Sequence, residues 1–539
     1  MTRIICTTLL VEKSPQALPL GAACVASAIK HYPGTQKECQ VKLISFSRED
    51  KEILPLKTDE QKANYIADYL LKEEPQIVCM SVFVWNRTIF ELCASRLHKH
   101  NIIIIAGGPE ITAHPDVFEN SFDYTVSGEG EIKVPRLIEK IILSGGKKLA
   151  KDEILSCYEG ASNSTDLSLL HSPYLDGTID PTEFGGALWE LARGCPFKCS
   201  YCYESKGEKT VRLFPEERID KELELFAQKK VPQVFVLDPT YNANKERALS
   251  LLKKIARVTP NTFYYFEARA EFIDHQMAKA FTKIPCALQI GLQSADENVL
   301  RKVNRPFNKK QFVKNIGILN QEGVTFGLDL IYGLPGESFT SFREGINFAA
   351  SLYPNNLEIF CLSVLPGTDL FDRAEELGLT FETAPPYNII KTDKFSPQDK
   401  IKAQSLAQAC TYFYNDGRAV PWFLTICHAL KTRPADFFQS FYDWAEKNKL
   451  DLCCCEHKII EENQIKFIAF LFKQKHLDRY SQAATDIIRF NGAISRRTAT
   501  GKSEKIRLIY PPEYIDSQYA LDLDFFVKNV KPHPSTISI

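Results

Sequence analysis

The sequence predicts an α/β protein with two parallel-sheet domains followed by a mainly helical domain. Short apolar segments alternate with helical patterns over residues 1–145 and again over 185–375, which is typical of parallel strands covered by helices. After residue 376 helical patterns dominate. Because 539 residues exceed one ordinary domain, we predict domains at 1–145, 185–375 and 376–539. A linker over 146–184, rich in Gly, Ser, Asn and Asp, joins the first two.

The first domain is predicted to be a doubly wound parallel sheet of the Rossmann or flavodoxin type. Its strands are expected at 4–10, 41–46, 77–83, 102–106 and 124–126. Ligands of such sheets bind beyond the carboxyl ends of the strands. Glycine-rich turns fall at those ends, at Gly107-Gly108-Pro109 and Gly128-Glu129-Gly130, where glycine lets a ligand approach the backbone closely.

The second domain is predicted to be a partial (β/α)6 barrel of the TIM type. Its strands are expected at 187–192, 233–237, 263–267, 287–292, 327–331 and 357–362. The active site of such a barrel lies at the carboxyl ends of the strands. The polar residues at those ends are Asp238, Glu267, Arg269, Gln293 and Ser294.

The C-terminal region carries no motif with an evident chemistry. Helices are expected at 400–414 and 435–447, and a strand at 505–510. The run Cys453-Cys454-Cys455 is its unusual feature. Adjacent side chains point in different directions, so we expect buried thiols there rather than a metal or redox site.

The composition limits the function classes. The formal net charge of -1 gives no indication of a nucleic-acid surface. The longest aliphatic runs are far shorter than a membrane span, and the N-terminus lacks the features of a signal peptide. We therefore expect a cytoplasmic protein, in which the 16 cysteines are thiols or metal ligands rather than disulfides.

The strongest motif is CxxxCxxC, formed by Cys195, Cys199 and Cys202 directly after the first expected barrel strand. Three thiolates on one tight loop can each ligate one iron of a [4Fe–4S] cluster. A missing fourth ligand leaves one iron open, which is the mark of a catalytic metal. The alternatives are buried thiols and a zinc knuckle, but no partner Cys-x-x-Cys pair for zinc occurs in the chain.

Together these features resemble the radical S-adenosylmethionine (SAM) superfamily, in particular its subgroup with an N-terminal cobalamin-binding domain. The resemblance covers residues 1 to about 375 and includes Gly291-Leu292-Gln293-Ser294 and the turn from Ile331 to Glu337. It implies a [4Fe–4S] cluster, SAM, and an electron donor such as flavodoxin or ferredoxin. The SAM-binding residues that it implies are Tyr201, Asp238, Glu267, Arg269, Gln293, Ser294, Ile331, Gly333 and Pro335. Two of these residues also have a structural interpretation, because Glu267 and Arg269 could form an ion pair. Arg193, beside the cysteine loop, could either steady the charge of the cluster or be purely structural.

The same resemblance implies cobalamin as a third cofactor. The residues implied to bind it are Leu20, Gly21, Ser81, Val82, Gly107, Gly108, Pro109, Gly128, Glu129 and Gly130. The DxHxxG motif that supplies a lower axial histidine in many cobalamin enzymes does not occur, so we expect no such ligand.

The activity that the resemblance implies is cobalamin-dependent methyl transfer to an unactivated carbon through an adenosyl radical. One alternative is a cobalamin-independent radical rearrangement or other C–H functionalisation. The other is a non-enzymatic cobalamin or iron–sulfur sensor. The sequence identifies neither the substrate nor a catalytic residue.

Overall fold

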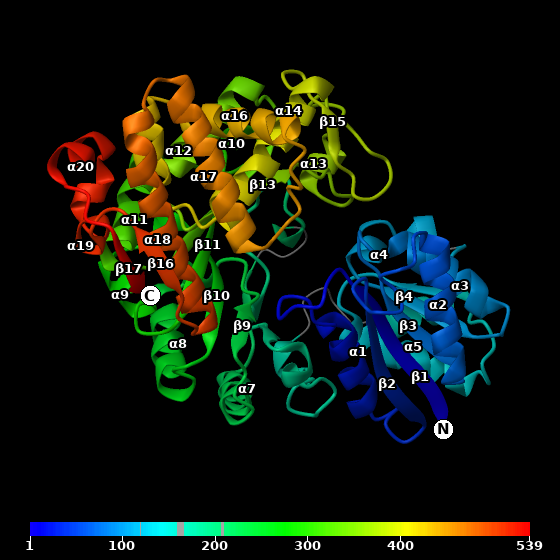
Figure 1. The fold of residues 1–539 in the computed structure, drawn as a ribbon. Helices are drawn as coiled ribbons and strands as arrows, with labels where there is room; N and C mark the ends of the chain where they lie inside the picture. Colours follow the sequence, from blue (N-terminus) through cyan, green and yellow to red (C-terminus); the bar gives the residue numbers. More distant parts are fainter. Residues whose placement is uncertain (119, 159–165, 206–209) are drawn as a thin grey trace.

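The computed structural model describes residues 1–118, 120–158, 166–205 and 210–539. Its N-terminal sheet forms one body, and the second sheet and the C-terminal helices form the other (Figure 1). The predicted order of a doubly wound domain, a partial barrel and a helical region is confirmed.

The N-terminal sheet is entirely parallel, in the order β2-β1-β3-β4-β5. Its strands are β1 (Thr2–Leu10), β2 (Cys39–Ser47), β3 (Ile77–Ser81), β4 (Ile103–Gly107) and β5 (Tyr124–Val126). The helices α1 (Leu20–His31) and α5 (Gly130–Leu143) cover one face, and α2 (Asp59–Lys72) and α3 (Arg87–His98) cover the other. This is the flavodoxin strand order, whose ligand crevice lies where the order reverses, between β1 and β3.

The segment after the first domain was predicted to be a linker over 146–184. It contains a helix that its sequence did not indicate, α6 (Lys151–Tyr158), and two short 3-10 turns. Residues 159–165 of this segment lie outside the described part of the chain.

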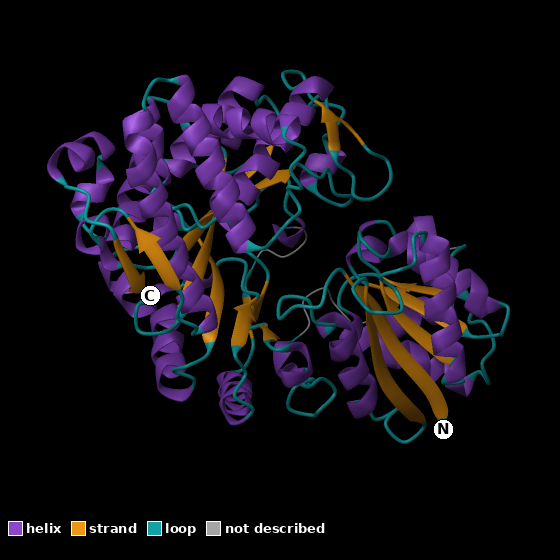
Figure 2. Cartoon of the chain, viewed as in Figure 1, coloured by secondary structure: helices purple, strands orange, loops and turns teal. Residues whose placement is uncertain are grey.

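The second sheet has six parallel strands in the order β13-β12-β11-β10-β9-β6. Figure 2 shows the strands of both sheets in orange. The strands are β6 (Ala187–Trp189), β9 (Gln233–Val236), β10 (Phe263–Ala268), β11 (Cys286–Gln293), β12 (Phe326–Tyr332) and β13 (Asn356–Cys361). The helices packed on its outer face are α7 (Glu216–Gln228), α8 (Lys245–Val258), α9 (His275–Phe281), α11 (Lys309–Glu322) and α12 (Phe339–Ala350).

The alternation of burial along these strands shows that the inner face of the barrel is open. Outward-facing Tyr264 and Phe266 on β10 are buried under the helices. Leu237, which follows β9, and Phe360 on β13 are apolar, yet they stay 41% and 50% exposed. Since the inward side chains of a filled barrel would be buried, this inner face leaves room for ligands.

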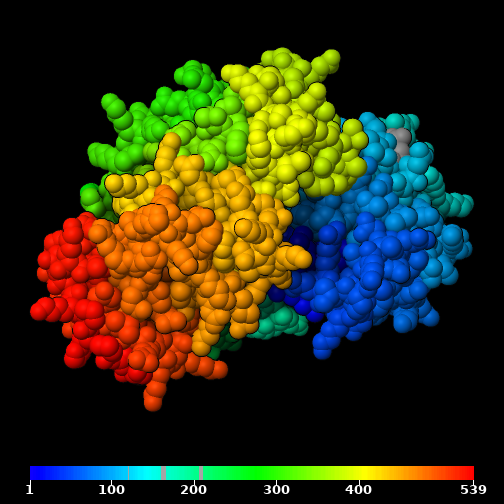
Figure 3. Space-filling model, turned by 45° about the horizontal axis from the view of Figure 1, so that its top comes forward, coloured from blue at the N-terminus to red at the C-terminus, as the bar shows by residue number. Residues whose placement is uncertain are grey.

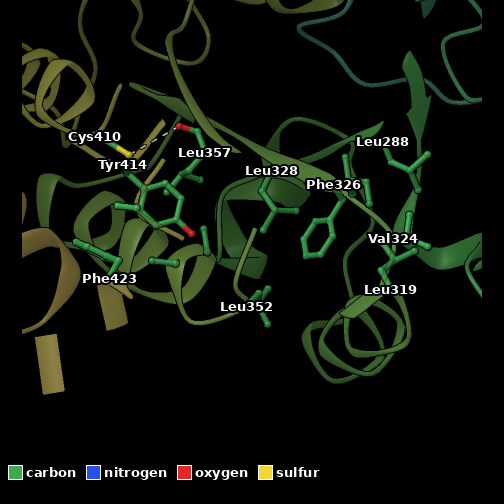
Figure 4. Close-up of a cluster of buried hydrophobic side chains, with 14 of the residues drawn as sticks. Leu288, Leu319, Val324, Phe326, Leu328, Leu352, Leu357, Cys410, Tyr414 and Phe423 are labelled. Atoms are coloured by element: carbon green, nitrogen blue, oxygen red, sulfur yellow. Dashed lines mark hydrogen bonds between the residues drawn. The ribbon is translucent and has the colours of Figure 1, made fainter. Parts of the chain in front are cut away.

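The C-terminal region seals the exposed edge of β13. The helix α14 (Pro397–Cys410) continues into the π-helical turn η7 (Thr411–Asp416) beside this strand. There the Asn415 amide takes the place of a neighbouring strand: its Oδ1 accepts from Leu357 N at 2.9 Å, and its Nδ2 donates to Leu357 O at 3.0 Å. Figure 4 shows Cys410 and Tyr414 beside the same residue. The Leu357 backbone, on the edge of the sheet, is thereby satisfied.

The rest of the C-terminal region is mainly helical, as predicted. It contains α15 (Phe423–Leu430), α16 (Pro434–Lys447), α17 (His457–Gln474), α18 (Ser481–Thr500), α20 (Leu523–Asn529) and the antiparallel pair β16 (Lys505–Leu508) and β17 (Ser535–Ser538). Its core is aromatic, with Phe413 in contact with Phe437, Phe441 and Phe467. Across the described residues, no helix combines the length and apolar character needed to cross a membrane.

Replacing Asn415 with leucine is expected to lower stability by about 2–3 kcal/mol, because Leu357 N–H loses its partner and Leu357 O keeps only the weak bond from the Cys410 thiol. Thermal unfolding would measure the loss. Asn448→Leu is the matched control, since Asn448 is exposed at the end of α16. Equal unfolding temperatures for Asn415→Leu and the wild type would show that the amide does not hold this edge.

Candidate active site

The three motif cysteines lie on one loop that leaves the first barrel strand. β6 leads into the short β7 (Ala192–Arg193), and Gly194 then turns the chain with a φ of +92°, which disfavours any residue with a side chain. Cys199 is buried, whereas Cys195 and Cys202 are partly exposed, and none of the three forms a disulfide. The loop therefore presents three cysteine sulfurs near the barrel mouth.

Neighbouring segments fix the backbone of this loop. Ser200 N donates to Val303 O at 3.0 Å, and Leu370 N donates to Ser200 O at 2.8 Å. The Asn304 side chain donates to Lys198 O at 2.6 Å. These contacts come from the end of α10 (Glu297–Lys302) and the start of α13 (Asp369–Asp372), so the thiols are held in place by two packed elements.

Arg305 connects the cysteine loop to the barrel, although the sequence did not point to it. Its Nη1 lies 3.7 Å from the Cys199 sulfur, and its Nη2 donates to Gly291 O on β11. Burial raises the pKa of the neighbouring Tyr201 phenol, while Arg305 acts to lower it. Arg305 follows a helix rather than a strand, which is why strand-end reasoning did not select it.

The site has polar atoms to offer to a bound group. Within the described residues, Ser200 Oγ and Gln293 Oε1 are buried without a hydrogen-bond partner, which is unusual for buried polar groups. The same residues contain no group of three His, Cys, Asp or Glu side chains placed to hold a single metal ion. In an iron–sulfur cubane each thiolate binds its own iron, so three sulfurs need not converge on one point. The loop, its unpartnered hydroxyl and the nearby Arg305 fit such a cluster.

The end of β11 is shaped by a bulge. Gln293 adopts a left-handed φ of +68°, and the register with β12 shifts between Gly291 and Gln293. A Cβ on Gly291 would lie 2.4 Å from Gln293 Nε2, so the glycine makes room for this side chain. The next residue, Ser294, donates to Glu337 Oε1 at 3.4 Å, and Glu337 Oε2 accepts from Gly333 N at 3.0 Å. Glu337 thus ties the ends of β11 and β12 together.

Two carboxylates face the open interior of the barrel. Glu267 is open to water, but it lies in a concave site. The surrounding protein atoms desolvate its carboxylate, and together with the nearby Asp329 they raise its pKa to about 7. Burial raises the pKa of Asp329 to about 6, against the effect of its bond from the Gln289 amide. Perturbed carboxylates in a cleft mark candidate functional groups. Asp329 interrupts the apolar strand β12, a signal that the sequence offered but that we did not use.

The alternative of an ion pair between Glu267 and Arg269 is not what the structure contains. Arg269 Nη2 pairs with Glu271 at 2.6 Å instead. Its guanidinium also lies 3.8 Å from the centre of the Phe197 ring in the cysteine loop. Arg269 is buried, so its positive charge is held against that loop.

The remaining predicted SAM-binding residues occupy different environments. Asp238 is buried, where it accepts from Leu191 N at 3.1 Å and pairs with Arg247 at 3.0 Å. Its carboxylate therefore supports the backbone before the cysteine loop. Ile331 lies opposite Phe360 on the inner face of the barrel, and Pro335 is buried in the turn after β12.

Glu337 predicts a measurable pH dependence. Burial raises its pKa to about 8, above the usual value of about 4.3. The folded protein therefore binds more protons than the unfolded chain between about pH 4.3 and 8, and this group's contribution to stability falls as the pH rises through that window. As the pH rises from 5 to 8, the unfolding temperature of Glu337→Gln is expected to fall less than that of the wild type. Glu375→Gln, at an exposed position, should follow the wild type. Parallel curves for Glu337→Gln and the wild type would contradict this.

Five of the predicted cobalamin-binding residues meet at the carboxyl edge of the first sheet. Ser81 lies opposite Gly107, and Val82 N donates to Gly107 O at 2.8 Å. Gly108 has a φ of +103°, and a Cβ there would lie 2.7 Å from Val82 O. Gly108 is thus required for the contact between these loops, and Pro109 starts the short α4 (Pro109–Ala113).

The other predicted cobalamin-binding residues lie at two helix starts. Leu20 and Gly21 begin α1, where a Cβ on Gly21 would meet open space. Gly128 has a left-handed φ of +78°, and its N–H donates to Thr112 Oγ1 at 2.9 Å. Gly130 begins α5. The residues therefore gather at the edge where the strand order predicts ligand binding.

Arg193 connects this edge to the cysteine loop. Its guanidinium pairs with Glu129 at 3.3 Å, Glu131 at 2.6 Å and Glu190 at 2.8 Å. Glu129 also pairs with Arg212 at 2.6 Å. The turn that contains Glu129 is thus fastened to the residue two positions before Cys195, which joins the two predicted cofactor regions.

The cysteine run in the C-terminal region corrects one expectation. Cys453 and Cys455 are exposed, and Cys454 is partly exposed. The expectation of buried thiols is therefore wrong for the two outer residues. They lie in the turn between α16 and α17, in which Leu452 and Cys454 pack against the core.

Comparison with known proteins identifies two segments. Residues 189–349 match the radical SAM superfamily, and residues 375–501 match a family described as a protein of unknown function, DUF4080. The cobalamin-dependent radical SAM methyltransferase TokK of Streptomyces tokunonensis is 26% identical over 399 residues, covering 64% of this chain and 57% of TokK. A 2-(S-pantetheinyl)-carbapenam-3-carboxylate methyltransferase of Streptantibioticus cattleyicolor is 26% identical over 353 residues, covering 58% of this chain and 50% of that protein. The chain thus spans little more than half of these relatives.

Two solved structures share the fold. The cobalamin-dependent SAM radical enzyme OxsB with aqua-cobalamin bound aligns with a TM-score of 0.59 at 14% identity, covering 98% of this chain and 83% of OxsB. The radical SAM methyltransferase TsrM from Kitasatospora setae aligns with a TM-score of 0.56 at 15% identity, covering 74% of this chain and 84% of TsrM. The family match over residues 189–349 identifies the barrel with its cysteine loop as a radical SAM domain, and the two solved structures share the fold of the chain.

Proposed function

We propose that this protein is a radical SAM enzyme that transfers a methyl group from cobalamin to an unactivated carbon of its substrate. When bound, a [4Fe–4S] cluster supplies the electron that cleaves SAM to an adenosyl radical, and cobalamin supplies the methyl group. The observation that carries the proposal is the cysteine loop joined through Arg193 to the edge of a flavodoxin-like sheet. Flavodoxin or ferredoxin is the proposed electron donor.

The residues of the chain divide the task between two regions. Cys195, Cys199 and Cys202 would ligate the cluster, and Arg305 would donate to a ligating sulfur. Beside them, Glu267 and Gln293 present polar atoms suited to the amine, carboxylate and hydroxyl groups of SAM. The lumen on the inner side of these residues stays open for a substrate.

The second region is the edge formed by Ser81 and the turns at Gly107–Pro109 and Gly128–Gly130. These backbone-rich turns would contact the corrinoid. None of the ten histidines stands in a DxHxxG motif, so we propose that cobalamin binds without the lower axial histidine of that motif.

The test is anaerobic reconstitution with iron, sulfide and hydroxocobalamin, followed by gel filtration and a visible spectrum. Retained corrinoid bands together with about four irons per chain are expected. Retained iron without corrinoid would instead support the alternative, a cobalamin-independent radical reaction. Retention of both cofactors without SAM cleavage would favour a sensor.

A further inference from the structure

A single tyrosine of the segment after the barrel reaches into the N-terminal domain. We propose that Tyr387 is a positioning residue that clamps the turn after β4 onto the barrel and so sets the position of the predicted cobalamin edge over the cysteine loop. The clamp rests on geometry alone, and its consequence for cobalamin rests on the proposed function. Tyr387 belongs to residues 375–501, the segment whose family has no assigned function.

The backbone of Tyr387 is anchored to the barrel. It lies between the short strands β14 (Thr380–Phe381) and β15 (Ile389–Lys391), with a left-handed φ of +59°. Val364 N donates to Tyr387 O at 2.9 Å, and Ile389 N donates to Leu362 O at 2.8 Å. Both partners directly follow β13, so the tyrosine moves with the barrel rather than with a free loop.

The side chain of Tyr387 completes a polar triad with buried Glu110 and partly buried Arg87 of the N-terminal domain. Its hydroxyl donates to Glu110 Oε2 at 2.8 Å and accepts from Arg87 Nη1 at 2.7 Å. Arg87 also pairs with Glu110 at 3.4 Å and lies over the Phe118 ring. Tyr387 and Glu110 are only 2% and 5% exposed, and burial raises the pKa of the phenol, so it keeps its proton as a donor. If one of the three groups were removed, the other two would each lose a hydrogen-bond partner, which costs free energy at a site of low dielectric constant.

The triad acts on the turn that faces the predicted cobalamin. Glu110 follows Pro109 directly, and the Gly108 backbone lies against Val82. The same seam contains a bond from Tyr203 OH to Pro109 O at 3.4 Å. Figure 3 shows the yellow-green residues of this segment against the blue N-terminal domain.

The clamp differs from the Arg193 network in the turn that it holds. Arg193 fastens the turn after β5 through Glu129 and Glu131, whereas Tyr387 fastens the turn after β4. A domain held at one point can still pivot, but contacts at two turns fix its orientation. Removing Tyr387's hydroxyl should therefore loosen one turn and leave the cysteine loop intact.

The first test is amide hydrogen exchange in Tyr387→Phe, which removes only the hydroxyl. We expect the amides of residues 108–114 to exchange about tenfold faster, the change produced by losing one charge-assisted hydrogen bond. Tyr353→Phe is the control, because Tyr353 is 50% exposed. Glu110→Gln should give a similar effect, and the double variant should add little to either. Exchange at 108–114 equal to that of the wild type would overturn the clamp.

The second test is titration with hydroxocobalamin in the absence of SAM. Tyr387→Phe should bind several-fold more weakly than the wild type while it keeps the same iron content. Equal affinity would overturn the positioning role. If the wild type itself takes up no hydroxocobalamin, the cobalamin part of the proposed function fails, and hydrogen exchange alone then decides whether the clamp exists.

Discussion

Replacing Cys195, Cys199 or Cys202 singly with alanine is expected to reduce the iron content of anaerobically reconstituted protein from about four to below about one per chain. In the proposed cluster each thiolate would hold one iron, and the loop that carries the three is fixed by its neighbours. SAM cleavage should fall below detection in all three variants. Iron analysis and the visible spectrum measure the effect.

The control for this series uses the other cysteine group. Cys453→Ala and Cys455→Ala remove exposed thiols in the turn before α17 and should leave iron content and SAM cleavage unchanged. If they lost iron while the loop variants kept it, the C-terminal cysteines rather than the barrel loop would hold the metal.

Replacing Arg193 with methionine is expected to destabilise the protein by about 3 kcal/mol, because it leaves partly buried carboxylates without their cation. Glu131 and Glu190 lose their ion-pair contact with Arg193, and Glu129 loses one ion pair while it keeps the one with Arg212. Thermal unfolding of the apoprotein would measure the loss.

Two further variants separate this effect from a general sensitivity to arginine loss. Adding Glu190→Gln to Arg193→Met should recover part of the stability, because it removes one of the uncompensated charges. Arg373→Met removes an arginine whose pairs with Asp369 and Glu376 are solvent-exposed, so it should cost less than about 1 kcal/mol. Equal losses for Arg193→Met and Arg373→Met would contradict the structural role of the network.

The strands of both sheets were predictable because their burial leaves a local signal. A run such as Ile103-Ile104-Ile105 is apolar on both faces, as a central parallel strand requires. The C-terminal helix α17 left a weaker signal. Glu461, Asn463 and Gln464 are polar but buried in it, and Gln464 donates to two carbonyls of the neighbouring turn. These residues interrupt the apolar periodicity that indicates a helix.

The candidate site was predictable only where chemistry and local sequence coincide. The three cysteines are close in sequence, so their spacing alone indicated a shared ligand. Arg305 reaches Cys199 across 106 residues, and Tyr387 reaches Glu110 across 277. Such contacts arise from tertiary packing, which one sequence does not encode as a pattern. The glycine-rich turn at Glu129 was predicted from its local sequence. Its ion pair with Arg193 was not, because that contact also arises from tertiary packing.

The most direct test of the account is SAM cleavage by the reconstituted protein under strong reductant. Anaerobic protein with about four irons per chain would be incubated with dithionite and SAM, and 5′-deoxyadenosine would be quantified, with Cys199→Ala as the blank. The account predicts 5′-deoxyadenosine from the wild type and none from the variant. Zinc in place of iron, or a fully loaded cluster that leaves SAM intact, would contradict it.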